Sequence, residues 1–417
     1  MTRPPSGRGA TTRRPARLLY VCYLTLDDPL THTQVVAYLT GLAAAGHDVH
    51  LLTFEPGLTR ARRHHWRARM RAVGITWHGL HYHKRPSLPA TVYDTLLGAV
   101  CIAVWSWWYR LDVVHARTHV PAAMALIARR LARTRPALVF DIRGLMAEEY
   151  EEAGRWRPGG VPSRLTKAVE TAAILRADRI VILTESAREK LFDAERRSTV
   201  HVIPCCANVE QIKRARPERE RVRRELGLSD CVVVVYVGKF PSWSMPGAMS
   251  DFFSSTCKLT DRLHFLILTQ GDGDVIRREL GRNHVDPGSY TVTSAPQGEV
   301  GAYLAAADFA ITFIKRAPST IMQSPTKLGE YLGAGLPVVH SAGIGDIDQL
   351  MSPDIGVRVT EHSANSYREA AAAILRLTHD PQTPERCRAA AERCLSLERV
   401  GIPRYLSVYE ALRGDPR

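Results

Sequence analysis

The sequence lacks any run of about 18–20 uninterrupted apolar residues, which is the length that a helix needs to span a bilayer. The nearest approach is Leu96–Tyr109, a stretch of core-helix length whose aromatic end holds three tryptophans and a tyrosine. Such an end suits a buried helix that reaches the domain surface, and it also suits a helix at a membrane interface. The pattern leaves both interpretations open.

Cysteine is scarce and has no metal-binding or disulfide pattern. None of the eight cysteines forms a Cys-x-x-Cys pair, and Cys205 and Cys206 are adjacent, which suits neither zinc binding nor an easy disulfide. Glycine (29), proline (25) and the 45% of hydrophobic residues are ordinary for a folded protein. The composition therefore excludes a disordered chain, a collagen and a disulfide scaffold, and it predicts a reducing, cytoplasmic setting.

Acidic residues are few relative to basic ones, and the imbalance lies in one half of the chain. Lysine and arginine number 56 against 42 aspartates and glutamates, a net charge of +14. Residues 1–212 hold 30 basic and 18 acidic side chains, whereas residues 213–417 hold 26 and 24. Residues 1–16 have no apolar core, so we interpret them as a disordered basic tail rather than a secretory signal. A second basic run, Arg60–Arg71, fits either a solvated helix face or a surface for an anionic lipid or substrate.

Short apolar runs alternate with helical patterns along the chain. Arg17–Tyr23 and His47–Phe54 are typical of strands, and a helical pattern lies between them. After a charged connector the alternation restarts at Cys231–Val237, a continuous apolar run typical of a central parallel strand. The alternation predicts an α/β protein with two doubly wound parallel-sheet (Rossmann-like) domains that face a cleft. The expected bounds of the two domains are 17–212 and 213–400. A terminal helix is expected over 401–417, and packing of this helix against the first domain is one option.

The most informative segment is Ser324–Val339. Its first three residues, Ser-Pro-Thr, predict a loop that enters a helix, and the N–H groups and dipole of a helix N-terminus favour a phosphate. Lys327 adds a cation there, and Glu330 lies one turn later, where it could accept hydrogen bonds from sugar hydroxyls. The same pattern also fits an ordinary capped helix with an ion pair between Lys327 and Glu330.

In this segment the sequence resembles the nucleotide-sugar site of family-four glycosyltransferases of the GT-B type. Glu330, followed by Gly335, Pro337 and Val338, matches the second glutamate and the Gly-x-Pro-Val turn of that family. Four more segments resemble family elements in the family's order: Leu39–Glu55, Asp112–Arg117, Ala177–Asn208 and Phe265–Leu280. The resemblance implies a GT-B fold and a retaining, metal-independent transfer from a nucleotide-diphospho-sugar co-substrate, with no cofactor.

The chain departs from the family pattern in several places. Met322 stands where the family has its first glutamate, so that residue's contact to the transferred sugar is absent. A segment with Thr33 and Gln34 replaces the Gly-Gly loop after the first strand, and Arg117 replaces the second histidine of a His-x-His strand end. Lys239 keeps the first basic position of the second domain, whereas the second lysine is missing. These departures resemble a divergent subgroup of enzymes that assemble surface polysaccharides.

The resemblance and the local patterns together give a set of expected site residues. Near the reacting atoms we expect Arg117, His119 and Lys327. Arg117 is expected because it stands at the second position of the His-x-His strand end, and His119 because a histidine exchanges a proton near neutral pH. A core or capping role is the alternative for His119. The donor is expected to bind at Gly238, Lys239, Gly271, Ser324, Thr326, Lys327 and Glu330. The acceptor is expected to bind at Thr33, Gln34, Asp141, Arg143 and Glu148.

Two groups of acidic residues have a structural role as an alternative to a role in a site. The helix with Glu148 and Glu149 could instead be a solvated face paired to Arg143. Two Asp-x-Asp spacings begin at Asp272 and Asp346, and we interpret both as loop structure rather than metal sites, because GT-B enzymes need no such motif.

Three functions are compatible with the sequence. The first is a hexosyl or N-acetylhexosaminyl transferase that acts on a saccharide, lipid-linked or small-molecule acceptor hydroxyl. The second is a nucleotide-sugar epimerase or hydrolase on the same fold, and the third is a non-catalytic protein that binds anionic membranes. A nucleic-acid partner is not expected, because the two basic runs hold only one Phe, Tyr or Trp residue, Trp66, and so lack an aromatic-interleaved basic motif. The expected location is cytoplasmic, with peripheral contact at the inner face of the membrane as a further option.

Overall fold

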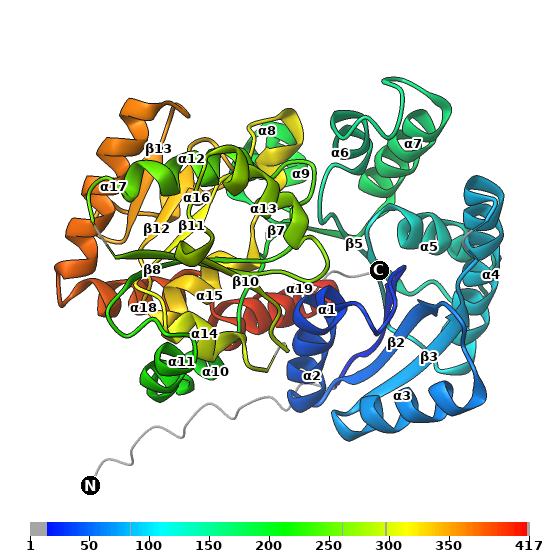
Figure 1. Cartoon of the computed structure of the whole chain (residues 1–417). Coiled ribbons are helices and arrows are strands. Elements are labelled where there is room, and N and C mark those ends of the chain that lie inside the picture. Colours follow the sequence, from blue (N-terminus) through cyan, green and yellow to red (C-terminus); the bar gives the residue numbers. More distant parts are fainter. Residues whose placement is uncertain (1–14, 84, 261, 297, 415–417) are drawn as a thin grey trace, which may run out of the picture.

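The computed structural model describes residues 15–83, 85–260, 262–296 and 298–414. Two domains, each built on one parallel sheet with helices on both faces, lie side by side (Figure 1). The predicted fold class of two doubly wound parallel-sheet domains is therefore confirmed. The basic tail predicted over residues 1–16 lies outside the described residues except for its last two.

The first domain contains a seven-stranded sheet whose order is β3-β2-β1-β4-β5-β6-β7. All of its strand pairings are parallel, and the order switches direction between β1 and β4. Its strands are β1 (Arg17–Cys22), β2 (Asp48–Glu55), β3 (Ile75–His81), β4 (Val113–Arg117), β5 (Ala137–Asp141), β6 (Arg179–Ile182) and β7 (Val200–Val202).

The second domain contains a six-stranded sheet whose order is β10-β9-β8-β11-β12-β13. These pairings are also parallel, and the switch lies between β8 and β11. Its strands are β8 (Val232–Val237), β9 (Leu263–Leu268), β10 (Tyr290–Thr293), β11 (Phe309–Thr312), β12 (Val338–Ser341) and β13 (Gly356–Val359).

Helices fill the connections between the strands. In the first domain they are α1 (Pro29–Thr31), the π-helical turn η1 (His32–Val36), α2 (Ala37–Ala44), α3 (Arg60–Ala72), α4 (Ser87–Trp108), α5 (His119–Leu131), α6 (Met146–Glu152), α7 (Val161–Arg176), α8 (Glu185–Leu191) and α9 (Ala194–Arg197). From the connector onward they are α10 (Val209–Arg214), η2 (Arg216–Glu218), α11 (Arg219–Glu225), α12 (Pro246–Thr256), α13 (Gly273–Arg282), η3 (Pro287–Ser289), α14 (Val300–Ala305), η4 (Pro318–Met322), α15 (Thr326–Ala334), α16 (Ile347–Leu350), α17 (Ala364–His379), α18 (Thr383–Cys394), η5 (Leu397–Gly401) and α19 (Ile402–Gly414).

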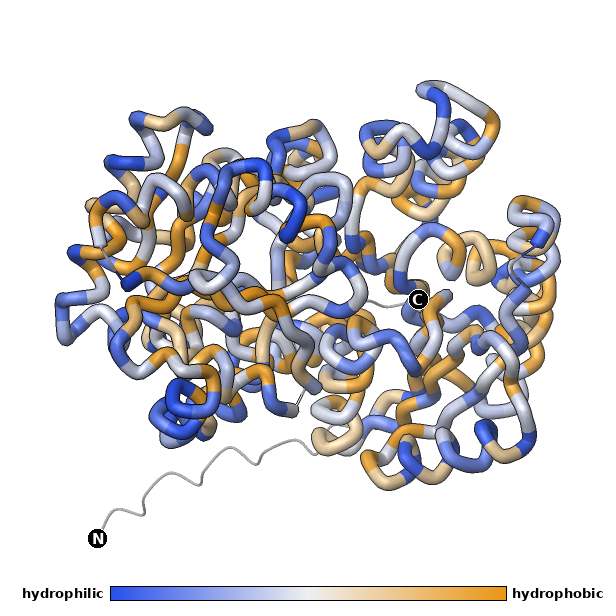
Figure 2. The backbone as a smooth tube through the Cα atoms, in the orientation of Figure 1, coloured by the Kyte–Doolittle hydropathy of each residue, from blue (hydrophilic) through white to orange (hydrophobic). Residues whose placement is uncertain are grey.

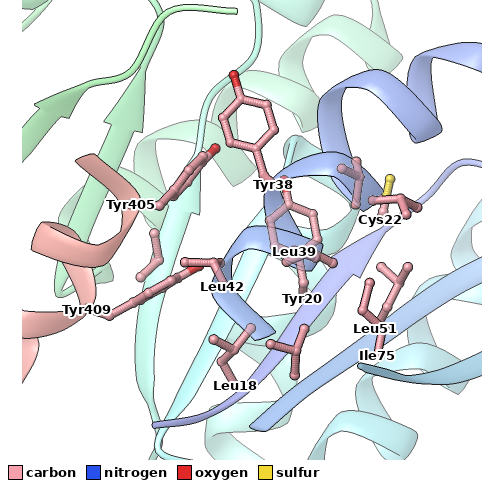
Figure 3. Close-up of a cluster of buried hydrophobic side chains, with 14 of the residues drawn as sticks. Leu18, Tyr20, Cys22, Tyr38, Leu39, Leu42, Leu51, Ile75, Tyr405 and Tyr409 are labelled. Carbon is pink, nitrogen blue, oxygen red and sulfur yellow. The ribbon is translucent and has the colours of Figure 1, made fainter. Parts of the chain in front are cut away.

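The helix α19 returns from the second domain to the first. Its Tyr405 and Tyr409 pack with Leu18 and Tyr20 of β1 and with Tyr38 of α2 in one buried cluster (Figure 3). Large aromatic side chains bury much apolar surface and usually find a partner for their hydroxyl groups. This packing ties the end of the chain to the sheet that borders the cleft.

The apolar stretch predicted at Leu96–Tyr109 belongs to the longer helix α4. By length and composition alone α4 could cross a membrane, a test that core helices of soluble proteins also pass. Its inner face packs against α5 and buries Asp94, whose carboxylate accepts hydrogen bonds from Tyr23 Oη at 2.8 Å and from the backbone N–H of His83 at 3.1 Å. In this structure α4 is therefore an outer-layer helix of the first domain.

Candidate functional site

A cavity of about 1370 Å³ lies between the two domains. Residues at the carboxyl ends of β1, β4, β8 and β9 line it, together with the N-terminal residues of α5 and α15. Open α/β sheets bind ligands at this edge, next to the switch in strand order. The predicted site residues that line the cavity are Thr33, Gln34, Arg117, His119, Arg143, Gly238, Lys239, Ser324, Thr326, Lys327 and Glu330.

Lys327 is held at the N-terminus of α15 against an aromatic ring. Its Nζ lies 4.0 Å from the centroid of the Tyr236 ring. Gly238 follows β8 with φ 124°, and a Cβ at that position would lie 3.2 Å from the same Nζ, so glycine leaves room for the ammonium group. Burial lowers the pKa of Lys327 to about 8, while nearby Glu330 opposes the shift. The cavity thus presents a partly desolvated cation beside free helix N–H groups.

Glu330 lines the same wall of the cavity, one helical turn from Lys327. Burial raises the pKa of Glu330, and the attraction of Lys327 opposes that rise. The charges of the two groups attract each other, but no salt bridge within 4.0 Å joins them among the described residues, so both stay available to a ligand in the cavity. Ser324 contributes to the entrance of this helix, because its Oγ accepts a hydrogen bond from the backbone N–H of Cys205 at 3.1 Å.

Gln34 connects the two domains across the cavity. Its Nε2 donates to Thr326 Oγ1 at 3.0 Å, and its Oε1 accepts from Arg117 Nη2 at 2.7 Å and from Arg143 Nη2 at 3.4 Å. Gln34 lies in the π-helical turn η1, and such turns are frequent at functional sites. One carboxamide therefore orients two guanidinium groups toward the N-terminus of α15.

The corner between β4 and α5 is strained. Thr118 has φ 69° and ψ −177°, a conformation that is almost confined to glycine. The residues on both sides of it, Arg117 and His119, line the cavity. Arg117 is buried, and its Nε and Nη1 find no hydrogen-bond partner within the described part of the chain. Its Nη1 lies 3.9 Å from Asp141 Oδ2, so an ion pair holds the guanidinium from behind while the side chain lines the cavity.

His119 has both a structural contact and a free nitrogen. Its Nε2 lies 2.7 Å from Glu170 Oε2 of α7, which fixes the ring, whereas its Nδ1 has no partner among the residues described. The sequence left a core role and a site role open for this histidine. The structure gives it a fixed ring orientation and a place in the cavity lining.

Glu149, on α6, is a cavity residue that the sequence did not single out from its neighbour. It lines the cavity, and burial raises its pKa to about 7; the charge of His119 opposes the shift, and Glu152 and Glu148 add to it. A Cβ on Gly144 would lie 2.2 Å from Glu149 Oε1, so the carboxylate lies directly over the preceding loop. A carboxyl group that titrates near neutral pH in a cleft is suited to exchange protons.

Glu148, in contrast, does not line the cavity, although from the sequence it was expected to bind the acceptor. Its Oε1 pairs with Lys167 Nζ at 2.9 Å on the outer side of α6. The two glutamates are adjacent on a helix, so they point about 100° apart, since a turn takes 3.6 residues. Part of the solvated-face interpretation therefore holds for Glu148, with Lys167 rather than Arg143 as its partner.

Asp141 was expected to face the cleft, and this expectation was wrong. It is fully buried outside the cavity lining, and its Oδ2 accepts hydrogen bonds from Tyr20 Oη at 3.2 Å and Tyr405 Oη at 3.0 Å. Burial alone would raise the pKa of Asp141, but Arg143, His115 and Arg117 hold it well below its usual value. The carboxylate therefore fixes the charged residues of the cavity from behind instead of contacting a ligand.

Replacing Asp141 by asparagine is expected to destabilise the protein by about 3–5 kcal/mol, because Arg143 and Arg117 lose their buried counter-charge. Tyr20→Phe serves as the control, since it removes one hydrogen bond to the same carboxylate and should cost about 1 kcal/mol. Urea unfolding at pH 7 measures both. Because the pKa of Asp141 is lowered in the folded state, its contribution should disappear as the pH falls below about 4. Equal costs for the two variants would contradict this assignment.

One other expectation, for Gly271, is corrected by the structure. Gly271 has φ 87° after β9 but is exposed and does not line the cavity, whereas the two residues before it do. Met322 is fully buried in the apolar cluster of the first domain and also lies outside the lining. A glutamate at this position of the structure would place a carboxylate in an apolar core.

The first aspartate of each Asp-x-Asp segment accepts hydrogen bonds from backbone N–H groups. Asp272 Oδ2 accepts from the backbone N–H of Phe240 at 3.2 Å, and Asp346 caps the N-terminus of α8 by accepting from the N–H groups of Glu185 and Ser186 at 2.6 and 2.9 Å. Within the described ranges, no three histidine, cysteine or acidic side chains gather as a metal site. Asp346 thereby joins the two domains next to the cavity.

Comparisons with known proteins identify the fold. Residues 31–206 match the family model described as the glycosyl transferase 4-like domain. Among curated proteins no significant match to the sequence is found. The N-terminal domain is thus similar in sequence to glycosyltransferase domains.

Solved structures resemble the whole chain. A glycosyltransferase from Rickettsia africae has a TM-score of 0.71 at 13% identity, covering 97% of this chain and 100% of that one. HepE of Anabaena, in complex with UDP and glucose, has a TM-score of 0.68 at 13% identity, with 96% and 100% coverage. Sucrose-phosphate synthase from Thermosynechococcus elongatus has a TM-score of 0.70 at 17% identity, also with 96% and 100% coverage. The chain therefore has the GT-B fold, and the resemblance found in the sequence is confirmed at this level.

Proposed function

We propose that the protein is a glycosyltransferase that moves a hexosyl or N-acetylhexosaminyl group from a nucleotide-diphospho-sugar to an acceptor hydroxyl. One observation carries this proposal. Two cationic side chains line the same interdomain cavity: the ammonium group of Lys327 at a helix N-terminus, and the buried guanidinium of Arg117, whose Nε and Nη1 have no hydrogen-bond partner among the described residues. Such an arrangement favours a bound diphosphate.

The donor is assigned to the wall formed by α15 and the end of β8. Lys327 and the backbone N–H groups of Thr326 and Lys327 would contact the diphosphate, and Lys239, which is exposed at the cavity, would add a second cation. Glu330 would accept hydrogen bonds from the ribose. HepE, which shares the fold, has been solved in complex with UDP, which supports a nucleotide ligand for this chain.

In the proposed reaction the bond between the anomeric carbon and the diphosphate oxygen breaks, and the acceptor oxygen bonds to the same carbon on the face from which the diphosphate leaves. Negative charge develops on the leaving diphosphate, so Lys327 and Arg117 would stabilise the transition state more than the bound donor. The acceptor hydroxyl loses its proton to the carboxylate of Glu149, which lines the cavity. We expect retention of the anomeric configuration and no metal ion, as the family resemblance implies.

A nucleotide screen tests the donor assignment. At about one hundred times its Kd, a nucleotide should stabilise the protein by about 2.7 kcal/mol and raise the Tm by several degrees. We expect one of UDP, GDP, ADP or dTDP to produce this shift with EDTA present. If none does so at millimolar concentration, the donor site is wrong.

Product analysis tests the reaction class. The donor found in the screen is incubated with and without a panel of acceptors, and the products are identified by NMR. Transfer with retained configuration supports the proposal, whereas free sugar or an epimerised donor without any acceptor would indicate a hydrolase or an epimerase.

A further inference from the structure

The interdomain cavity continues beyond the charged residues as an apolar groove of the first domain. The helix α5 packs against both α4 and α7, so it forms the floor between them (Figure 1). The residues that line this part of the same cavity are mainly aliphatic. They include Leu88, Val92 and Leu96 of α4, Val120 and Ile127 of α5, and Leu165 of α7.

The walls of this groove expose apolar side chains that a soluble domain normally covers. Leu88, Val92 and Leu96 recur every four residues on one face of α4 and are 46%, 50% and 52% exposed, and Leu165 across the groove is 51% exposed. Figure 2 shows that α4 is hydrophobic over most of its length although it lies at the edge of the molecule. At 1.5 Å per residue, the wall from Leu88 to Leu96 is about 12 Å long. Contiguous exposed apolar surface of this kind marks a binding site.

The groove has a polar end and an apolar end. His119 stands at the first residue of α5 with Arg117 and Glu149 around it, while Ile127 lies two turns further along the same helix. A ligand that fills the cavity would therefore place a polar head at the charged end and an apolar chain between α4 and α7. This matches an amphipathic molecule rather than a free sugar.

We propose that the acceptor is a lipid-linked saccharide or lipid alcohol whose hydrocarbon chain lies in the groove between α4 and α7. This inference rests on the proposed function, since it assigns the acceptor of the same site. Each buried methylene should strengthen binding about fourfold at most, so chain length, not the saccharide alone, should determine acceptor affinity.

Binding of a hydrocarbon chain is tested independently of transfer. The probe is dansyl-undecanoic acid, compared with dansylglycine, which has the same fluorophore and carboxylate but no chain. We expect the wild-type protein to bind the long probe at least tenfold more tightly than the short one. Equal affinities would overturn the proposal.

Two matched double variants locate the binding. Leu96→Gln with Leu165→Gln changes exposed residues of the groove, and Val104→Gln with Leu175→Gln changes residues of the same two helices that are 50% and 71% exposed but do not line it. The groove variant should bind the long probe at least tenfold more weakly, and the control variant should stay within twofold of wild type. Equal weakening of probe binding in both variants would show that the probe adsorbs to the exposed helix faces, and it would overturn the assignment of the groove as the binding site.

Assays of sugar transfer and of nucleotide binding test the lipid acceptor and the proposed function separately. With a long-chain alkyl glycoside as acceptor, the groove variant should lose at least tenfold in kcat/KM, whereas with the methyl glycoside it should equal wild type. The nucleotide-induced Tm shift should be unchanged in both variants. Absence of that shift in the wild type would contradict the glycosyltransferase assignment but not hydrocarbon binding in the groove, whereas equal kcat/KM for long-chain and methyl acceptors would contradict the lipid acceptor alone.

Discussion

The variant Lys327→Met is expected to lower kcat/KM by about 10²–10³ and to weaken nucleotide binding, while leaving the fold intact. Methionine keeps most of the apolar length that packs over Tyr236 but removes the cation from the N-terminus of α15. Loss of one electrostatic contact to the developing charge has effects of this size in other enzymes. Steady-state kinetics and nucleotide-induced thermal shifts measure the two effects. Lys258→Met, at an exposed position outside the cavity, is the matched control and should change neither.

The pH dependence of nucleotide affinity gives a sharper test of Lys327. Its pKa in the free protein is about 8, so above that pH the side chain increasingly becomes neutral. A bound diphosphate favours the charged form, so binding takes up a proton, and affinity should fall about tenfold per pH unit above pH 8. The variant Lys327→Arg stays charged and should not show this fall. A wild-type affinity that is flat from pH 7 to 9.5 would exclude Lys327 as the diphosphate contact.

The α15 region was predictable because its signals are local. A Ser-Pro-Thr entry, Lys327 and Glu330 one turn apart, and a glycine after the last turn all lie within Ser324–Val339. The structure has a helix there from Thr326 to Ala334, and Gly335 follows it with φ 88° in the left-handed region. A short segment whose start and stop signals lie close together in the sequence determines its own helix. The positions of its side chains along that helix could therefore be predicted before the fold was known.

Edge strands and long helices were less predictable. The strand β3 alternates buried and exposed residues and includes two histidines and a tryptophan, so it lacks the continuous apolar run that marks the central strand β8. The strand β13 is only four residues long. The helix α4 begins at Ser87, nine residues before the apolar stretch noticed in the sequence, because Thr91, Asp94 and Thr95 interrupt its apolar pattern. Their polar groups are satisfied inside the fold or at the cavity, which the sequence does not reveal.

Side-chain direction limited the site prediction more than element position did. Asp141 ends β5 where expected, but its carboxylate accepts a hydrogen bond from Tyr405 of α19, an element that comes more than 260 residues later. Glu148 and Glu149 are adjacent and chemically identical, and only the position of α7 with its Lys167 decides which of them faces the cavity. Both outcomes depend on tertiary contacts that local patterns do not contain.

The variant Glu149→Gln is expected to lower kcat by about 10²–10³ and to leave nucleotide affinity unchanged. Glutamine keeps the size of the side chain but cannot accept the proton of an acceptor hydroxyl, and general-base groups contribute about this much. The neighbouring substitution Glu148→Gln changes the same residue type on the same helix but only breaks an exposed pair with Lys167, so its kcat should stay within about twofold of wild type.

The pH profile distinguishes proton transfer at Glu149 from a merely structural role. Burial raises its pKa to about 7, so the carboxylate that can accept a proton is the minor form below that pH and the major form above it. The kcat/KM of the wild type should therefore rise about tenfold per pH unit up to about pH 7 and then level off, until Lys327 begins to lose its charge near pH 8. In Glu149→Gln the acidic limb should vanish while the alkaline limb remains. If both limbs persist in that variant, the proton passes elsewhere, and the unpaired Nδ1 of His119 is then the next group to test.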